Sequence, residues 1–165
     1  MFRLGKTFAA GLMMISLVAA PIRARAADIH TEIHVDVPPA FAWSAIRDVG
    51  AVHTRLARGF VVNTVLADGV RTVTFRDGLT PQVVKERIVT IDDQEMRVAY
   101  GAIETQAIFH AASIQVIADG KGCKLVWITD VLPDAFKDPI SQKMELGMAA
   151  MKKTLEEDAK RGTAR

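Results

Sequence analysis

The stretch IHTEIHVDVPPAFAWSAIRDVG, residues 29–50, sets the beginning of the fold. From Ile29 to Val37 apolar or uncharged residues alternate with polar ones, which is the period of a half-buried β-strand. Pro38-Pro39 ends this strand and opens a helix, because proline is favoured at the first helical position. Gly50 breaks the helix, and residues 51–58 can form a second, short one. The stretch therefore predicts one strand followed by two short helices.

Six further apolar or alternating runs follow at regular spacing, separated by turn signals such as ADG, RDG and DDQ. The runs span residues 60–67, 70–75, 81–91, 95–103, 108–118 and 123–132. A long helix follows from Ile140, and its apolar face comprises Met144, Met148, Met151 and Leu155. This order predicts an α+β fold in which a curved, seven-stranded antiparallel sheet wraps around the C-terminal helix. Such a sheet tends to leave a cavity beside the helix, which is a candidate ligand site.

The first 26 residues have the features of an export signal. A basic start with Arg3 and Lys6 precedes a short apolar run, and Ala24-Arg25-Ala26 fits a cleavage site. An uncleaved anchor helix is the alternative interpretation. We expect cleavage near Ala26, leaving residues 27–165 as a single periplasmic or secreted domain without a stable membrane anchor. Cys123 is the only cysteine, so the chain can form no internal disulfide, and a lipid anchor is not expected.

Charge excludes one class of partner. The whole chain has 21 basic and 19 acidic residues, but the predicted leader contains four basic residues and no acidic one. The remaining 17 basic and 19 acidic residues include no basic cluster, so we do not expect nucleic-acid binding.

Three adjacent charges occur in the strand VVKERIV, residues 83–89. Glu86 shares a face with two apolar residues, whereas Lys85 and Arg87 share the opposite face. Burying the Glu86 face desolvates fewer charges, so we expect Glu86 to point inward. A buried carboxylate needs a partner or water.

Arg71 is the partner that a hairpin supplies. A turn at Asp77-Gly78 places Val73 opposite Val84 and Arg71 opposite Glu86. The pair can be purely structural, or Glu86, with or without Arg71, can be the polar contact for a ligand. A third interpretation makes Glu86 a general acid or base in an apolar pocket.

The histidines do not indicate a metal site. HTEIH superficially resembles the zinc motif HExxH, but the glutamate is one place late, and His30 and His34 are about 13 Å apart on a strand. His53 could line a pocket mouth, while lone histidines such as His53 and His110 are more often structural. The chain has no P-loop, Rossmann glycine pattern or G-x-S-x-G motif, and we expect no metal or cofactor.

The order of elements and several motifs resemble the SRPBCC superfamily. Its START-like helix-grip fold is shared by bacterial polyketide cyclase/dehydratase-like proteins, birch-pollen-type allergens and plant abscisic-acid receptors. VDVPPAFAWSAIRDVG resembles the opening strand, proline link and tryptophan-bearing helix. VRTVTFRDG and VVKERIVTIDD resemble the arginine strand, its Asp-Gly turn and the ERL-type strand. Aromatic residues of the family fall at Tyr100, Phe109 and Trp127, and the resemblance covers about residues 28 to 160.

In the plant receptors, the ERL glutamate points into the pocket and helps to anchor a carboxylate ligand through water. Glu86 is the corresponding residue here, and DGLTP, residues 77–81, corresponds to the receptor gate loop SGLPA. Thr80-Pro81 departs from that loop, and residues 102–109 contain no HRL latch. The resemblance therefore does not imply a hormone receptor.

These observations together favour a cavity that binds a small hydrophobic or amphipathic molecule, with binding preferred over catalysis. The expected ligand-binding residues are Arg71, Val84, Glu86, Ile88, Val98, Tyr100, Phe109, Met144, Gly147, Met148 and Met151. For Tyr100 and the methionines, plain core packing is the alternative. Two other functions stay open. One is a cyclase- or dehydratase-like enzyme with Glu86 as base and Tyr100 or Arg71 stabilising an oxyanion. The other, which the resemblance implies, is an accessory protein that docks an exported redox enzyme, as superfamily members encoded with methanol-oxidation systems do.

Overall fold

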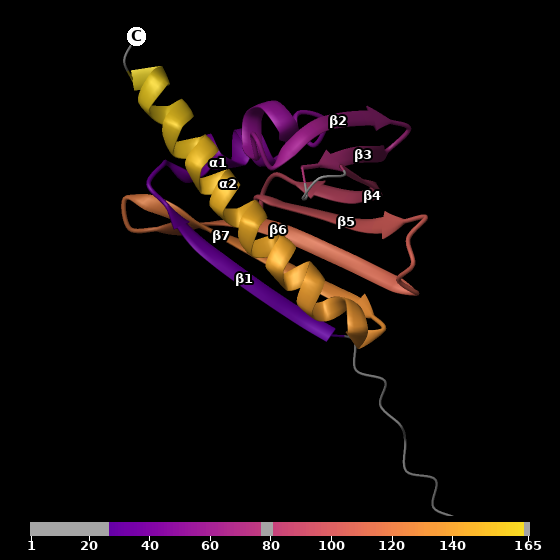
Figure 1. Cartoon of the computed structure of the whole chain (residues 1–165). Helices are drawn as coiled ribbons and strands as arrows, with labels where there is room; N and C mark the ends of the chain where they lie inside the picture. Colours follow the sequence, from indigo (N-terminus) through magenta and orange to yellow (C-terminus); the bar gives the residue numbers. More distant parts are fainter. Residues whose placement is uncertain (1–26, 77–80, 164–165) are drawn as a thin grey trace, which may run out of the picture.

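The computed structural model describes residues 27–76 and 81–163. The predicted leader and the predicted Asp77-Gly78 turn lie outside these ranges. Seven strands form one antiparallel sheet in the order β1-β7-β6-β5-β4-β3-β2, which confirms the predicted architecture (Figure 1). Their bounds are β1 Ala27–Val35, β2 Val61–Ala67, β3 Val70–Phe75, β4 Gln82–Asp92, β5 Arg97–Ile103, β6 Phe109–Asp119 and β7 Gly122–Leu132.

The helices follow the expected order. They are α1 (Pro39–Ile46), a turn of π-helix η1 (Val52–Leu56), a 3-10 turn η2 (Asp134–Phe136) and α2 (Lys137–Thr163). The long helix begins three residues before the expected Ile140, so Pro139 lies inside its first turn. Proline is tolerated there because the first four N–H groups of a helix have no partner within it.

One face of the sheet packs against α2, which crosses it diagonally (Figure 1). In the main core, Met148, Met151 and Leu155 of α2 lie among buried side chains that include Ile46 of α1 and Leu125 of β7. On the first strand, His30, Glu32 and His34 are exposed, as the alternation predicts. No helix within the described ranges is long and apolar enough to cross a membrane.

The two short helices close one end of the sheet. The Trp43 indole N–H on α1 donates a hydrogen bond to Asp93 Oδ1 at 2.9 Å, and Arg47 bonds to the same carboxylate. Asp93 follows β4, so these bonds fix α1 against the end of the β4 strand. Ile46, Val52 and Leu56 consequently form an apolar wall over the space between the sheet and α2.

Candidate ligand-binding cavity

The β3–β4 register brings the predicted ion pair together. Arg71 lies opposite Glu86 and Val73 lies opposite Val84, as the hairpin argument predicted. Arg71 Nε donates to Glu86 Oε2 at 2.5 Å, and the two residues are only 8% and 6% exposed. Lys85 and Arg87 are exposed on the opposite face of β4. Of the three adjacent charged residues of β4, Glu86 is therefore buried in an ion pair, whereas Lys85 and Arg87 are exposed to solvent.

Tyr100 of β5 lies against the Arg71–Glu86 ion pair, and the three side chains form one polar group. The Arg71 guanidinium carbon lies 4.5 Å from the centre of the Tyr100 ring, a cation–π contact. Burial raises the pKa of the Tyr100 phenol, and the nearby Glu86 charge raises it further, more than Arg71 and Trp127 lower it. Burial lowers the pKa of Arg71, but Glu86 and Tyr100 raise it by more. Tyr100 therefore stays protonated and Arg71 stays charged at neutral pH.

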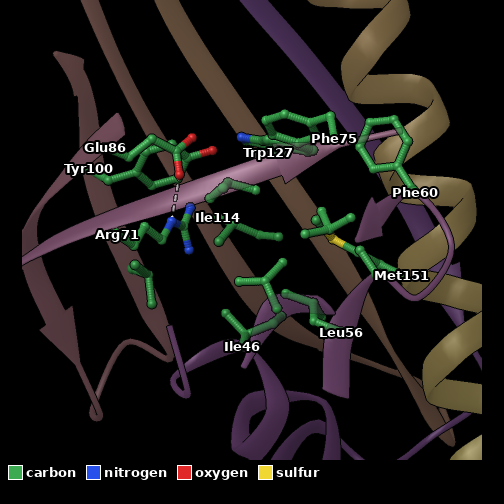
Figure 2. Close-up of a pocket in the computed structure, with 15 residues that line it drawn as sticks. Ile46, Leu56, Phe60, Arg71, Phe75, Glu86, Tyr100, Ile114, Trp127 and Met151 are labelled. Carbon is green, nitrogen blue, oxygen red and sulfur yellow. Dashed lines mark hydrogen bonds and ion pairs between the residues drawn. The ribbon is translucent and has the colours of Figure 1, made fainter. Parts of the chain in front are cut away.

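Trp127 of β7 is a buried donor beside this group. Its indole nitrogen points toward the oxygens of Glu86 and Tyr100 (Figure 2). The Trp127 N–H is shielded from solvent and has no hydrogen-bond partner of good geometry among the described residues. An unsatisfied buried donor costs about 1–3 kcal/mol, so this N–H favours an acceptor that a bound molecule or water can supply.

The Trp127 ring packs against α2 at Gly147. A methyl group at Gly147 would stand 2.9 Å from Trp127 Cζ3 and 3.2 Å from Phe60 Cε1. The first distance is too short for ordinary contact, so only glycine lets the helix approach the indole this closely. Gly147, which the sequence predicts in the ligand-binding wall, is therefore covered by the Trp127 ring.

Two adjoining spaces meet at the polar group that Glu86, Tyr100 and Trp127 form. The inner cavity, about 40 Å³, lies under α1 and η1, and apolar side chains such as Ile46, Leu56 and Met151 surround most of it (Figure 2). The outer cavity, about 660 Å³, lies between β4, the residues joining β5 to β6, and the first half of α2. The inner space suits a water or a small group, whereas the outer one has the size of small-molecule sites. Both spaces are lined by Phe75, Glu86, Tyr100 and Trp127.

Lys143 of α2 lies on the wall of the outer cavity. Its ammonium nitrogen is 5.1 Å from the centre of the Phe75 ring and bonds to the Gln82 side chain. These contacts connect α2 to the end of β3 and the beginning of β4. The polar lining also includes His110 and Thr129, so the outer cavity combines apolar walls with a few polar groups.

Seven of the eleven predicted residues line one or both cavities: Arg71, Val84, Glu86, Val98, Tyr100, Met144 and Met151. The remaining four do not, and their predicted place in the cavity wall is corrected. Ile88 packs against the core at a β4–β5 register shift, and Met148 is fully buried core filling. Gly147 lies behind the Trp127 ring. Phe109 is 48% exposed, because it belongs to the opposite face of β6.

Sequence reasoning missed several cavity residues that carry polar groups, among them Trp127 and His110. Trp127 was named only as a family aromatic, and His110 was interpreted as a structural histidine. The alternation of faces along β6 could have identified His110 as a cavity residue, because His110 shares a face with the buried Ala112 and Ile114. His53, which could have lined a pocket mouth, lines neither cavity. Within residues 27–76 and 81–163, no group of three His, Cys, Asp or Glu residues could hold a metal ion.

A curved antiparallel sheet closed around one long helix, with a cavity between them, defines a helix-grip protein. The model of the family described as polyketide cyclase / dehydrase and lipid transport matches residues 26–165. The chain therefore belongs to that family, within the SRPBCC superfamily that its sequence resembles.

Solved structures agree on the fold. An uncharacterized protein from Bacillus thuringiensis has a TM-score of 0.67 at 15% identity, covering 78% of this chain and 98% of that one. The protein XoxI from Bacillus cereus has a TM-score of 0.64 at 18% identity, with coverages of 80% and 94%. Norcoclaurine synthase from Thalictrum flavum has a TM-score of 0.63 at 20% identity, with coverages of 92% and 98%. No curated protein sequence matches the chain significantly. At these identities the likeness concerns the fold alone.

Proposed function

We propose that the protein binds a small amphipathic molecule whose apolar body occupies the outer cavity and whose polar end lies at Glu86, Tyr100 and Trp127. The observation that carries this proposal is the buried polar group of Glu86, Tyr100 and Trp127 at the boundary of a space of about 660 Å³. A ligand oxygen placed there would accept the Trp127 hydrogen bond. Its apolar part would contact Val84 and Met144 and release water from their surfaces.

The polar group is better suited to orienting a ligand than to transferring a proton. Glu86 already accepts a hydrogen bond from Arg71, which holds the carboxylate in place. Burial raises the pKa of Tyr100, so its phenol donates hydrogen bonds and does not act as a base at neutral pH. These two features favour a binding protein over the cyclase-like enzyme in which Glu86 acts as the base.

Export and release outside the cytoplasm form part of the proposal. Their support is the leader pattern of residues 1–26 and its Ala24-Arg25-Ala26 cleavage site. A ligand met in that compartment would be a molecule taken up or released by the cell. Docking to an exported redox enzyme stays a prediction, for which no surface of the described residues gives separate support.

The two tryptophans allow a direct test. We expect 1-anilinonaphthalene, a neutral aromatic dye with an apolar body and a polar N–H, to bind once per chain and quench the fluorescence of Trp127 in the cavity wall. Trp43 lies on α1 outside both cavities. The quenching should persist in Trp43→Phe and be largely lost in Trp127→Phe, with dye emission measured in parallel to confirm occupancy. Dye that fails to bind, or that quenches both variants equally, would contradict a site at Trp127.

A further inference from the structure

His110 is held in one tautomer by the neighbouring strand. The backbone N–H of Ala102 on β5 donates to His110 Nδ1 at 3.2 Å. Because that nitrogen accepts a hydrogen bond, the proton of the neutral imidazole must be on Nε2. Burial lowers the pKa of His110 and outweighs the opposing effect of Glu86, so the neutral ring predominates at pH 7. In the described part of the chain, no residue bonds to Nε2.

Glu86 and His110 stand on either side of Ala102. Glu86 is the direct partner of Ala102 in the β4–β5 ladder, and His110 is bonded to Ala102 from β6. The backbones of β4 and β6 are two strand spacings apart, about 10 Å. Ala102 has only a methyl group, so it forms a low floor between the two larger side chains. All three residues line the outer cavity, and the charge of Glu86 acts on His110.

The chemistry of the two groups is complementary. A carboxylate has about four acceptor positions, and Arg71 Nε occupies one of them on Glu86 Oε2. His110 presents a neutral N–H donor. An oxygen that donates to one group and accepts from the other needs about 5–6 Å between them, which two side chains leaning over a 10 Å backbone separation can provide.

We propose that Glu86 and His110 together bind one hydroxyl group of the ligand above Ala102, the carboxylate accepting its hydrogen and the imidazole donating to its oxygen. This inference rests on the proposed function and narrows the ligand class to neutral apolar molecules that carry a phenol, enol or alcohol group. An ether in the same place lacks the hydrogen that Glu86 accepts. A carboxylate would be repelled by Glu86, because Arg71 is already engaged with that residue.

Three matched probes test the selection: naphthol, its methyl ether methoxynaphthalene, and naphthoate, each competing with the anilinonaphthalene dye for the full-length protein. We expect naphthol to compete at least about tenfold better than the ether, because a hydrogen bond to a charged group is lost with the ether. Naphthoate should compete less well than naphthol. In nitrogen-edited NMR, the Nε2–H signal of His110 should shift with naphthol.

Two conservative variants separate the roles of the ring nitrogens. His110→Asn retains an acceptor for the Ala102 N–H but brings no donor to the Nε2 position, so naphthol and its ether should both compete several-fold less well than in the wild type, while the preference for naphthol, which comes from Glu86, persists. His110→Gln places an amide donor near that position and should recover much of the lost affinity for both probes. Equal competition by naphthol and the ether in the wild type, with dye still displaced, would overturn this inference and leave the proposed function standing. Absence of dye binding would overturn both.

Discussion

Replacing Arg71 by methionine should lower the free energy of unfolding by about 3–5 kcal/mol, the cost of leaving a buried charge without its partner. Glu86 is 6% exposed and accepts its hydrogen bond from Arg71 Nε, so removing the guanidinium leaves a largely buried carboxylate without its cation. For a domain of this size, such a loss lowers the melting temperature by roughly 10 °C. Urea denaturation followed by circular dichroism measures the change.

Two further variants separate the charge effect from the loss of side-chain volume. Arg87→Met removes an exposed arginine from the opposite face of β4 and should change the stability by no more than about 0.5 kcal/mol. The double variant Arg71→Met with Glu86→Leu removes both buried charges and should recover most of the lost stability. A loss below about 1 kcal/mol in the single Arg71 variant would mean that water reaches the pair in solution.

Filling the floor of the outer cavity should reduce binding more than any change at its rim. Ala102→Leu adds three carbons between Glu86 and His110, in space that the proposed ligand occupies. We expect at least a tenfold weaker affinity for 1-anilinonaphthalene, with a stability change of about 1 kcal/mol or less, because the new side chain enters an open cavity and not a packed core. Fluorescence titration gives the affinity, and urea denaturation gives the stability.

Ala99→Leu is the matched control for the cavity-filling variant. Ala99 lies on the same strand between Val98 and Tyr100, which point inward and are almost fully buried, so its side chain lies on the outer face of the sheet. The same change there should leave dye affinity within about twofold of the wild type. Equal loss of affinity in both variants would indicate a general effect on the sheet, and no loss in either would place the dye elsewhere.

Local periodicity was sufficient to predict the ion pair. The period of a strand decides which face of β4 carries Glu86, and the turn signal Asp77-Gly78 in the sequence predicts which residue of β3 lies opposite. Both rules act over fewer than about twenty residues. Arg71 and Glu86 therefore meet as predicted, without any knowledge of how α2 packs.

Contacts between distant elements were not predictable in the same way. Whether Gly147 exposes a thin helix wall or accommodates a ring depends on Trp127, which comes from β7, and no local pattern connects the two. The placement of Phe109 was wrong because it rested on family resemblance, whereas the parity of Ala112 and Ile114 assigns the inward position to His110. The early start of α2 depends on how its first turn tolerates Pro139.

Methyl NMR of the methionines tests the central claim most directly. Met144 lines the outer cavity and Met151 the inner one, while Met96 and Met148 line neither. With methionine methyls labelled with carbon-13 and assigned by Met→Leu variants, saturating 1-anilinonaphthalene should shift Met144 most and Met151 less. The Met96 and Met148 signals should stay in place. Shifts confined to Met96 and Met148, or no shift of Met144 at saturation, would contradict a ligand-binding cavity between the sheet and α2.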